Sequence, residues 1–281
     1  MKPKLNQAFA CLTVLTLAVA CTKNPNPDPP IHDTVYTPKP DTTVNLKKGL
    51  LVYLPFSGNI ADSSGNNNPT TAVGSVLTYD AHGYANNAFG ASTGQRVYVV
   101  NNGSIKFDTA YSLSFGFTVN DTTKQATFVS LVDPTTGAGV TFNIGFTTTA
   151  HGRFSWGTED ASLGCSQIGK NDPYNIIDTT NFIPVPGAWY NAIATYNKGV
   201  TKIYINGVMI YTKTSLGHTA NLCPTGRLIV GAWWDNDPLA FNGKVDNVRL
   251  YGRLLTPNEI IELSKSYQVT SNSVRPGLQT N

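Results

Sequence analysis

Short runs of alternating apolar and polar residues fill the chain from residue 50 to residue 251, and Gly, Asn, Asp and Pro separate one run from the next. A period of two turns one face of an extended segment towards a core and the other towards solvent. Each run therefore predicts a β-strand. The predicted strands are 51–56, 96–100, 113–119, 128–132, 140–146, 189–196, 202–205, 208–211, 228–232 and 245–251.

Two local signals define particular elements. Asn206-Gly207 lies between two apolar runs, and these residues adopt the two positive φ angles that a type I′ hairpin turn needs. Thr256-Pro257-Asn258-Glu259 matches a capping box with Pro at the first helical position. The residues that follow predict a short helix with an apolar face of Ile260, Leu263 and Tyr267.

The body of the chain shows many strands and no helical period between them, so its apolar faces must be buried by stacking two sheets. We predict an all-β fold, a two-sheet antiparallel β-sandwich (jelly roll) with one short C-terminal helix, as one domain over 45–268. The Gly-rich stretch 155–186 predicts an elaborated loop. Residues 269–281 predict a disordered tail.

The N-terminus has the pattern of an export signal. Lys2 and Lys4 precede an apolar stretch that is too short to span a bilayer but suits a signal-peptide core. Its end, LAVAC at 17–21, resembles a bacterial lipobox, which predicts a lipoprotein signal peptide over 1–20 and a lipid on Cys21. The alternative is an ordinary signal peptide with a chance cysteine, and Cys11 follows too little apolar sequence to replace Cys21.

Residues 21–44 are rich in Pro and polar residues, which predicts a flexible linker. With the lipid on Cys21, the sequence predicts an outer-membrane lipoprotein of the bacterial cell envelope that faces the periplasm or the cell surface. An exported chain meets oxidising conditions, in which Cys165 and Cys223 can form a disulfide. The alternative for these two cysteines is a pair of buried free thiols.

The charge pattern argues against nucleic acid as a partner. The formal net charge is +3 at pH 7, and charged residues make up 13% of the chain. Lys and Arg are scattered along the sequence, so no basic run is present that could neutralise a series of phosphates.

Three segments resemble a known family. They are LPFSGNIADSSGN at 54–66, WY at 189–190 leading to YING at 204–207, and FNGKVDNVRLY at 241–251. In order and spacing the region 49–267 resembles the bacterial laminin-G-like domains of the concanavalin A-like lectin/glucanase superfamily. The resemblance implies a jelly roll, and it leaves the activity open because this fold carries lectins, hydrolases and adhesion modules.

The supply of carboxylates argues against an enzyme. Retaining glycosidases place two carboxylates about 5 to 5.5 Å apart, and the hydrolases of the family use alternating Glu residues on one strand. This chain has three Glu: Glu159 in the predicted loop, and Glu259 and Glu262 on the predicted helix. We therefore expect no catalysis by that route, and the pair Asp235 and Asp237 is what keeps an atypical glycoside hydrolase as a third hypothesis.

Aromatic residues next to polar ones mark candidate ligand contacts, because sugar rings pack their C–H faces on indoles while their hydroxyls need polar partners. We assign Trp189 to the core, and at most one of Trp233 and Trp234 can face a groove if the strand continues there. The predicted ligand-binding residues are Trp156, Tyr174, Trp234, Asp235 and Asp237.

The family resemblance also implies a calcium site. Asn59, Asp62 and Asp246 fall in two segments where members of the family often bind calcium through oxygen ligands. The alternative needs no metal: Asp62 starts an Asx-turn with Ser64 and Gly65, and Asp246 binds loop amides. The calcium would be structural.

Two main functions follow. The first is non-catalytic binding of a glycan at the cell surface, which predicts a groove lined by exposed Trp with Asp or Asn. The second is a structural or protein-binding adhesion module without sugar affinity, in which the aromatic residues are buried. Common exposure of Trp156 and Trp234 distinguishes the two.

Overall fold

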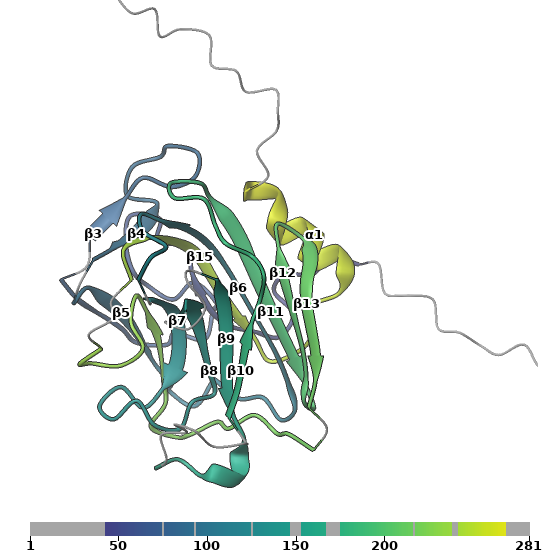
Figure 1. The fold of residues 1–281 in the computed structure, drawn as a ribbon. Helices are drawn as coiled ribbons and strands as arrows, with labels where there is room; N and C mark the ends of the chain where they lie inside the picture. Colours follow the sequence, from purple (N-terminus) through teal and green to yellow (C-terminus); the bar gives the residue numbers. More distant parts are fainter. Residues whose placement is uncertain are drawn as a thin grey trace, which may run out of the picture. The chain divides into compact units, whose positions relative to one another are not determined.

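The alternating runs form two antiparallel sheets that stack face to face (Figure 1). The computed structural model describes residues 43–74, 76–92, 94–124, 126–146, 153–166, 175–215, 217–237 and 241–267. The signal peptide with Cys21, nearly all of the linker, Tyr174 and the predicted tail lie outside the described residues. The helices in the described part of the chain are too short and polar to cross a membrane.

The first sheet has eight strands among the described residues, with the order β13-β12-β11-β6-β15-β4-β3, and β1 also pairs with β15. Its strands are β1 (Leu50–Leu54), β3 (Val76–Thr78), β4 (Ala88–Ala91), β6 (Ala110–Val119), β11 (Tyr190–Asn197), β12 (Val200–Ile205), β13 (Val208–Thr214) and β15 (Gly243–Tyr251).

The second sheet has seven strands among the described residues, with the order β10-β9-β8-β7-β14-β5-β2. Its strands are β2 (Thr70–Val73), β5 (Arg96–Val100), β7 (Ala126–Val132), β8 (Phe142–Phe146), β9 (Phe154–Glu159), β10 (Asn175–Thr179) and β14 (Arg227–Val230). The predicted all-β sandwich with one short C-terminal helix is confirmed.

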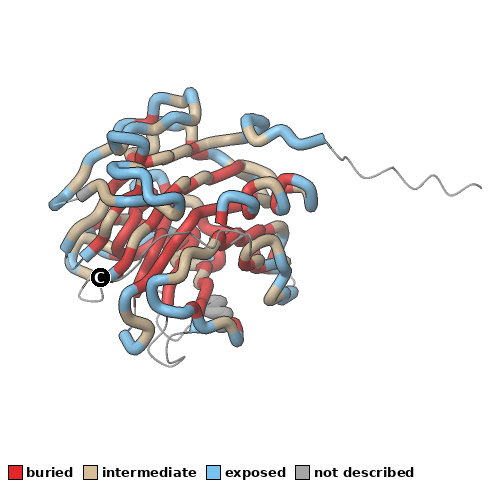
Figure 2. Tube along the Cα trace, turned by 90° about the horizontal axis from the view of Figure 1, so that it is seen from above, coloured by how far each residue is buried: buried red, intermediate tan, exposed pale blue. Residues whose placement is uncertain are grey.

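Aromatic side chains fill the space between the sheets. On β6, Phe115 and Phe117 contact Phe128 of β7, with the Phe117 and Phe128 ring centroids 4.7 Å apart. Figure 2 shows the buried segments running along the middle of the sandwich and the exposed segments around them. Ring pairs of this kind add about 0.5 to 1.5 kcal/mol beyond the area they bury.

β6 is buried on both faces because two different layers cover it. Its large residues face the core, and the residues that alternate with them are small. Gly116 is one of these: a Cβ there would lie 2.2 Å from the ring of Tyr267. The missing side chain is therefore what lets the C-terminal segment dock on the sheet.

Both local signals are confirmed. Asn206 and Gly207 have φ angles of 50° and 81°, and Ile205 pairs with Val208 across the turn. Helix α1 (Pro257–Ser264) begins with the predicted capping box, in which Thr256 and Glu259 bind each other's backbone amides. Ile260 and Leu263 of α1 are buried, and so is Tyr267 in the 3₁₀ helix η3 (Lys265–Tyr267).

The expected loop over 155–186 is wrong in part, because this stretch contains most of β9, the 3₁₀ helix η2 (Ala161–Leu163) and β10. β9 reads FSWGTE, and its Gly and small polar residues hide the strand period in the sequence. β2, β3 and β4 were missed as well. They are three or four residues long, which is too short for an alternation to be recognised.

Glu259 joins the helix to the rest of the domain. Its carboxylate accepts hydrogen bonds from Arg253 Nη1 at 2.7 Å and Nη2 at 2.8 Å, and from the amides of Thr256 and Asn45. Burial raises the pKa of Glu259, but these hydrogen bonds outweigh burial and leave that pKa below its ordinary value of 4.5.

We expect Glu259→Gln to lower the free energy of unfolding by about 3 kcal/mol at pH 7, because it breaks a buried ion pair. The folded-state pKa is lowered, so the ionised carboxylate stabilises the fold above pH 4.5, and this contribution is lost as the pH falls through the folded-state pKa. Urea unfolding from pH 3 to pH 8 measures this, and the deficit of the variant should shrink below pH 4.5.

The matched control is Glu262→Gln on the same helix, where the exposed pair with Lys265 should contribute about 0.5 kcal/mol or less. Equal losses in the two variants would contradict the assigned role of Glu259.

Candidate functional site

The candidate site lies on the outer face of the seven-stranded sheet. Val97 and Val99 of β5 point into the core, so Tyr98 between them points outwards. The strand register places Tyr98 beside Ile229 of β14, and Ile229 beside Ser130 of β7. A second apolar cluster forms on this face, and Trp233 packs against it. Its buried members are Tyr98, Val132, Val140, Ile229 and Ala232.

The segment Trp233–Asp237 folds back over this face and is fixed by hydrogen bonds. The amide of Trp233 donates to Asp237 Oδ2 at 2.8 Å, and the amide of Asp237 donates to the Trp234 carbonyl. Ser130 Oγ donates to the carbonyls of Ala232 and Trp233. These contacts tie the segment to the centre of the sheet, so its side chains are held in place.

The two tryptophans form one aromatic unit. The Trp233 and Trp234 rings lie edge to face, with centroids 4.9 Å apart, and both side chains are half-buried. Trp234 covers Gly137, where a Cβ would lie 3.3 Å from the indole. Trp233 Nε1 is buried and has no hydrogen-bond partner in the described part of the chain. β14 ends at Val230, so Trp233 and Trp234 do not lie on a strand. The expectation that they point to opposite faces of the sheet therefore does not apply.

Next to the tryptophans lies a polar group that we call the Arg96–Tyr98–Asp235 cluster. The hydroxyl of Tyr98 accepts a hydrogen bond from Arg96 Nε and donates one to Asp235 Oδ1. Arg96 Nε is 3.9 Å from the same Asp235 oxygen. Burial, and then the hydrogen bond to Asp235, raise the pKa of Tyr98, so the phenol keeps its proton at neutral pH.

Arg96 and Tyr98 were missed by sequence reasoning. They stand two apart on a predicted strand and so share one face, which was the available signal. Nothing in the sequence indicated that Asp235 lies next to Tyr98 in space, because the two residues are 137 positions apart in the chain.

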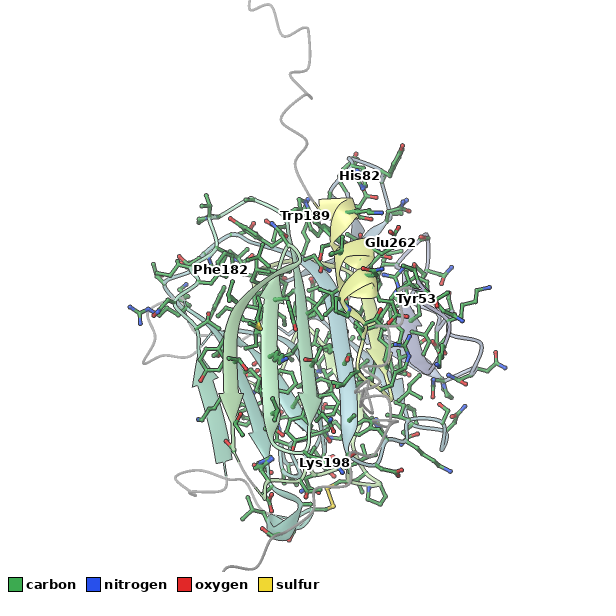
Figure 3. All side chains as sticks on the ribbon, turned by 90° about the vertical axis from the view of Figure 1, so that its right-hand side faces the viewer. Tyr53, His82, Phe182, Trp189, Lys198 and Glu262 are labelled. Carbon is green, nitrogen blue, oxygen red and sulfur yellow. A yellow bond between two sulfur atoms is a disulfide. The ribbon has the colours of Figure 1, made fainter. Side chains whose placement is uncertain are left out.

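The structure reverses the roles predicted for two other tryptophans. Trp156, a predicted ligand contact, is fully buried between the sheets and stacks on Tyr111 at 5.7 Å. Trp189, assigned to the core, is half-buried on the outside of the other sheet and stacks on Tyr267. Figure 3 shows Trp189 beside α1. The prediction that Trp156 and Trp234 line one groove is therefore wrong. The two are not exposed together, which by the criterion of common exposure favours the protein-binding alternative, and a glycan site would have to use Trp234 without Trp156.

The carboxylates considered for catalysis are engaged elsewhere. Asp235 accepts from Tyr98, and Asp237 accepts from the Trp233 amide within its own turn. Glu159 lies at the end of β9 and not in a loop, with 1% of its surface exposed, and it accepts from the Val140 amide at 2.9 Å.

Asn59 and Asp62, two of the residues predicted to bind calcium, accept hydrogen bonds within the loop that follows β1. Asn59 Oδ1 accepts from the Ala61 amide. Asp62 accepts five hydrogen bonds, from the Tyr53, Ser64 and Asn68 amides and from the Ser64 and Asn68 side chains. Burial raises the pKa of Asp62, but these donors outweigh it and leave that pKa lowered. The predicted Asx-turn is present, with Ser64 N donating to Asp62 Oδ1 at 3.0 Å.

Asp246 stands apart from the other two. It is buried on β15, where Oδ2 accepts from Tyr267 and Asn247, and Oδ1 has no hydrogen-bond partner among the described residues. Burial raises the pKa of Asp246 to about 6, and the nearby Asp80 acts in the same direction. The described residues contain no cluster of three or more His, Cys, Asp or Glu that could hold a metal. A calcium site of Asn59, Asp62 and Asp246 stays a prediction.

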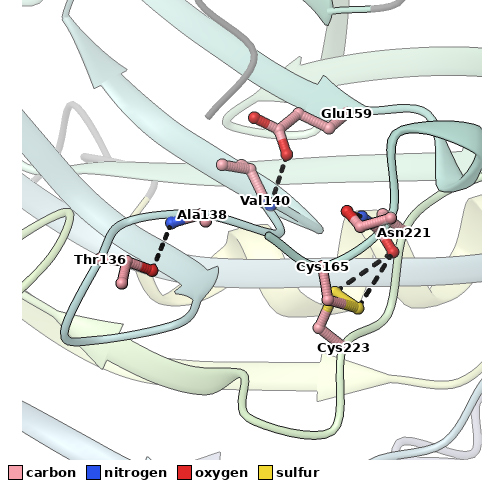
Figure 4. The surroundings of a disulfide bond; sticks show 8 residues. Thr136, Ala138, Val140, Glu159, Cys165, Asn221 and Cys223 are labelled. Atoms are coloured by element: carbon pink, nitrogen blue, oxygen red, sulfur yellow. Dashed lines mark hydrogen bonds between the residues drawn. A yellow bond between two sulfur atoms is a disulfide. The ribbon is translucent and has the colours of Figure 1, made fainter. Parts of the chain in front are cut away.

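The predicted disulfide between Cys165 and Cys223 is confirmed, with the two Cα atoms 5.6 Å apart. It joins the segment after η2 to the turn before β14 (Figure 4). Gly139 lies against it, since a Cβ there would come within 2.6 Å of Cys223 Sγ. The bond therefore lies against the loop that contains Gly137, on which Trp234 packs.

The chain belongs to the concanavalin A-like lectin/glucanases superfamily, whose family model matches residues 90–261. No curated protein sequence matches the chain.

Among solved structures, it is similar to domain 4 of AbnA, an extracellular arabinanase from Geobacillus stearothermophilus in complex with arabinotriose. The TM-score is 0.56 at 20% identity, over 77% of this chain and 98% of that one. It is also similar to the binding domain of botulinum neurotoxin DC in complex with rat synaptotagmin II, with a TM-score of 0.60 at 18% identity, over 80% of this chain and 53% of that one. The chain thus spans about half the length of the neurotoxin domains that it matches.

We expect Trp156→Ala to lower the free energy of unfolding by about 3 to 5 kcal/mol, because it leaves a cavity between the sheets. Trp189→Ala should cost about 1 to 2 kcal/mol, because this side chain is half-buried. Guanidinium unfolding of both variants measures the difference. Equal stability losses would show that the two side chains do not occupy the positions described.

Proposed function

We propose that the protein is a non-catalytic carbohydrate-binding module, and that Trp234 and Asp235 contact the sugar while the buried Tyr98 and its neighbour Arg96 hold Asp235 in place. The observation that carries this proposal is the half-buried indole of Trp234 beside a carboxylate, a phenol and a guanidinium. An indole face packs on the C–H face of a pyranose or furanose ring, and the carboxylate binds its hydroxyls. Asp235 keeps 38% of its side-chain surface exposed for such contacts.

Solved structures of the same fold support a glycan ligand. AbnA domain 4 was solved in complex with arabinotriose, and the entry of botulinum neurotoxin type C into cells depends on two ganglioside molecules. Both are similar to this chain in fold, at identities of 20% and 18%. From these two structures we carry over to this chain only the class of ligand, a glycan, and not the role of any residue.

The absence of catalysis is part of the proposal. A retaining mechanism needs two carboxylates facing each other across the sugar bond. Asp235 and Asp237 are each bound within the scaffold, and Glu159 is buried against a backbone amide. These contacts support a non-catalytic role for the three carboxylates.

A protein ligand is the second candidate. Trp, Tyr and Arg are the residues that contribute most to protein–protein hot spots, and Trp234, Tyr98 and Arg96 lie together here. The neurotoxin DC binding domain was solved with synaptotagmin II, which is a protein partner for a related fold.

A glycan array probed with the purified protein, with and without calcium, tests the carbohydrate proposal. We expect Trp234→Ala and Asp235→Asn to lower binding at least tenfold, because the first removes the stacking face and the second the charged acceptor. Tyr84→Ala is the matched control, since Tyr84 is 65% exposed on the loop between β3 and β4. Binding by neither the parent nor the control would favour the protein-binding alternative.

We further propose that Cys21 carries the lipid that anchors the domain to the bacterial envelope. The support is the LAVAC motif at 17–21 after an apolar stretch. Metabolic labelling with radioactive palmitate in a bacterial host should mark the parent and Cys11→Ser but not Cys21→Ser. Equal labelling of the two variants would reject this assignment.

A further inference from the structure

A separate cavity of about 300 Å³ opens beside the candidate site. It lies between the end of β5, the loop that follows β7 and the turn that precedes β14. Its volume is at the lower end of the range for small-molecule sites. The lining side chains that carry polar groups are Asn101, Asp133, Thr135, Thr225 and Arg227.

Asp133 supplies a fixed negative charge to this cavity. Its Oδ1 accepts from the amides of Thr135 at 2.9 Å and Thr136 at 3.0 Å. Burial raises the pKa of Asp133, but these bonds and that of the Thr225 hydroxyl outweigh it and leave the pKa lowered. The carboxylate is therefore ionised at neutral pH, and its second oxygen can accept further hydrogen bonds.

Arg227 supplies the opposite charge. It pairs with Val100 on one side and Val132 on the other, so its side chain lies on the same outer face as Tyr98. The Arg227 side chain is exposed, and it makes no hydrogen bond or ion pair with the part of the chain that the structure describes. Its guanidinium can therefore donate to a ligand without first breaking a contact.

Local contacts hold the backbone that surrounds the cavity. Pro224 and Thr225 follow directly on the disulfide-bonded Cys223, whose carbonyl accepts from the Gly226 amide at 3.0 Å. Asn101 Oδ1 accepts from two backbone amides, which fixes the opposite wall. These contacts hold the backbone around the cavity, whereas the exposed Arg227 side chain becomes ordered only when a ligand binds.

We propose that this Asp133–Arg227 pocket binds one neutral monosaccharide unit, with vicinal hydroxyls that donate to Asp133 and accept from Arg227. The inference rests on the proposed function, since the loop that begins with Asp133 and Pro134 separates the pocket from Trp234. The Asp235 amide donates to the Pro134 carbonyl at 2.7 Å, so pocket and aromatic surface are joined through one hydrogen bond. The opposite charges of Asp133 and Arg227 offset each other in the pocket lining, which suits an uncharged ligand.

The test follows backbone amide signals of the full chain by NMR while D-glucose, D-galactose, D-mannose or L-arabinose is added at millimolar concentration. We expect at least one of these sugars to shift the signals of Thr225, Gly226 and Arg227. Arg227→Ala and Thr225→Val should weaken that sugar at least tenfold. Arg153→Ala, which removes an exposed cation outside the pocket, is the matched control.

The outcomes separate this inference from the proposed function. In one outcome, glycans on the array bind the parent and lose affinity in Trp234→Ala, but no monosaccharide shifts the NMR signals of the pocket residues. The proposed sugar site in the pocket is then overturned, while the proposed function stands. Unchanged affinity in Arg227→Ala and Thr225→Val overturns the sugar site in the pocket too. If monosaccharides bind in the pocket and Trp234→Ala leaves array binding intact, the pocket stands and the aromatic contact fails.

Discussion

The aromatic layer between the two sheets is the interaction on which the rest of the structure depends. Phe117, Phe128 and Trp156 are fully buried in it, and no residue can take part without turning its strand neighbours to the opposite face. Burying Val97 and Val99 in this layer turns Arg96 and Tyr98 outwards, and burying Trp156 turns Ser155 and Gly157 outwards. The core thus decides which side chains are available for binding.

Three further structural features shape the outer face of the seven-stranded sheet. Trp233–Asp237 folds back over β7 and β14, the loop from Asp133 supports Trp234 through Gly137, and the Cys165–Cys223 disulfide lies against that loop at Gly139. Their joint effect is a surface with an indole, a charged cluster and a small polar pocket. Each of these sits on backbone that is held by hydrogen bonds, which suits a site that binds without moving.

Membership of the superfamily fixes the architecture and leaves the ligand to the loops. Two carboxylates accept hydrogen bonds from backbone amides: Glu159 from Val140, and Asp237 from Trp233. Asp62 does the same, and its five hydrogen bonds hold the loop after β1.

The sequence by itself determined the features that depend on local periodicity and turn chemistry: most of the strands, the Asn206-Gly207 turn, the capped helix and the sandwich class. It also indicated Trp234 and Asp235. Tertiary structure alone decided that Trp156 is core and Trp189 peripheral, because a lone Trp in a short strand carries no sign of which face is inside. It alone brought Tyr98 to Asp235 and Asp133 near Arg227, since contacts across about 100 residues depend on strand order, which local pattern does not encode.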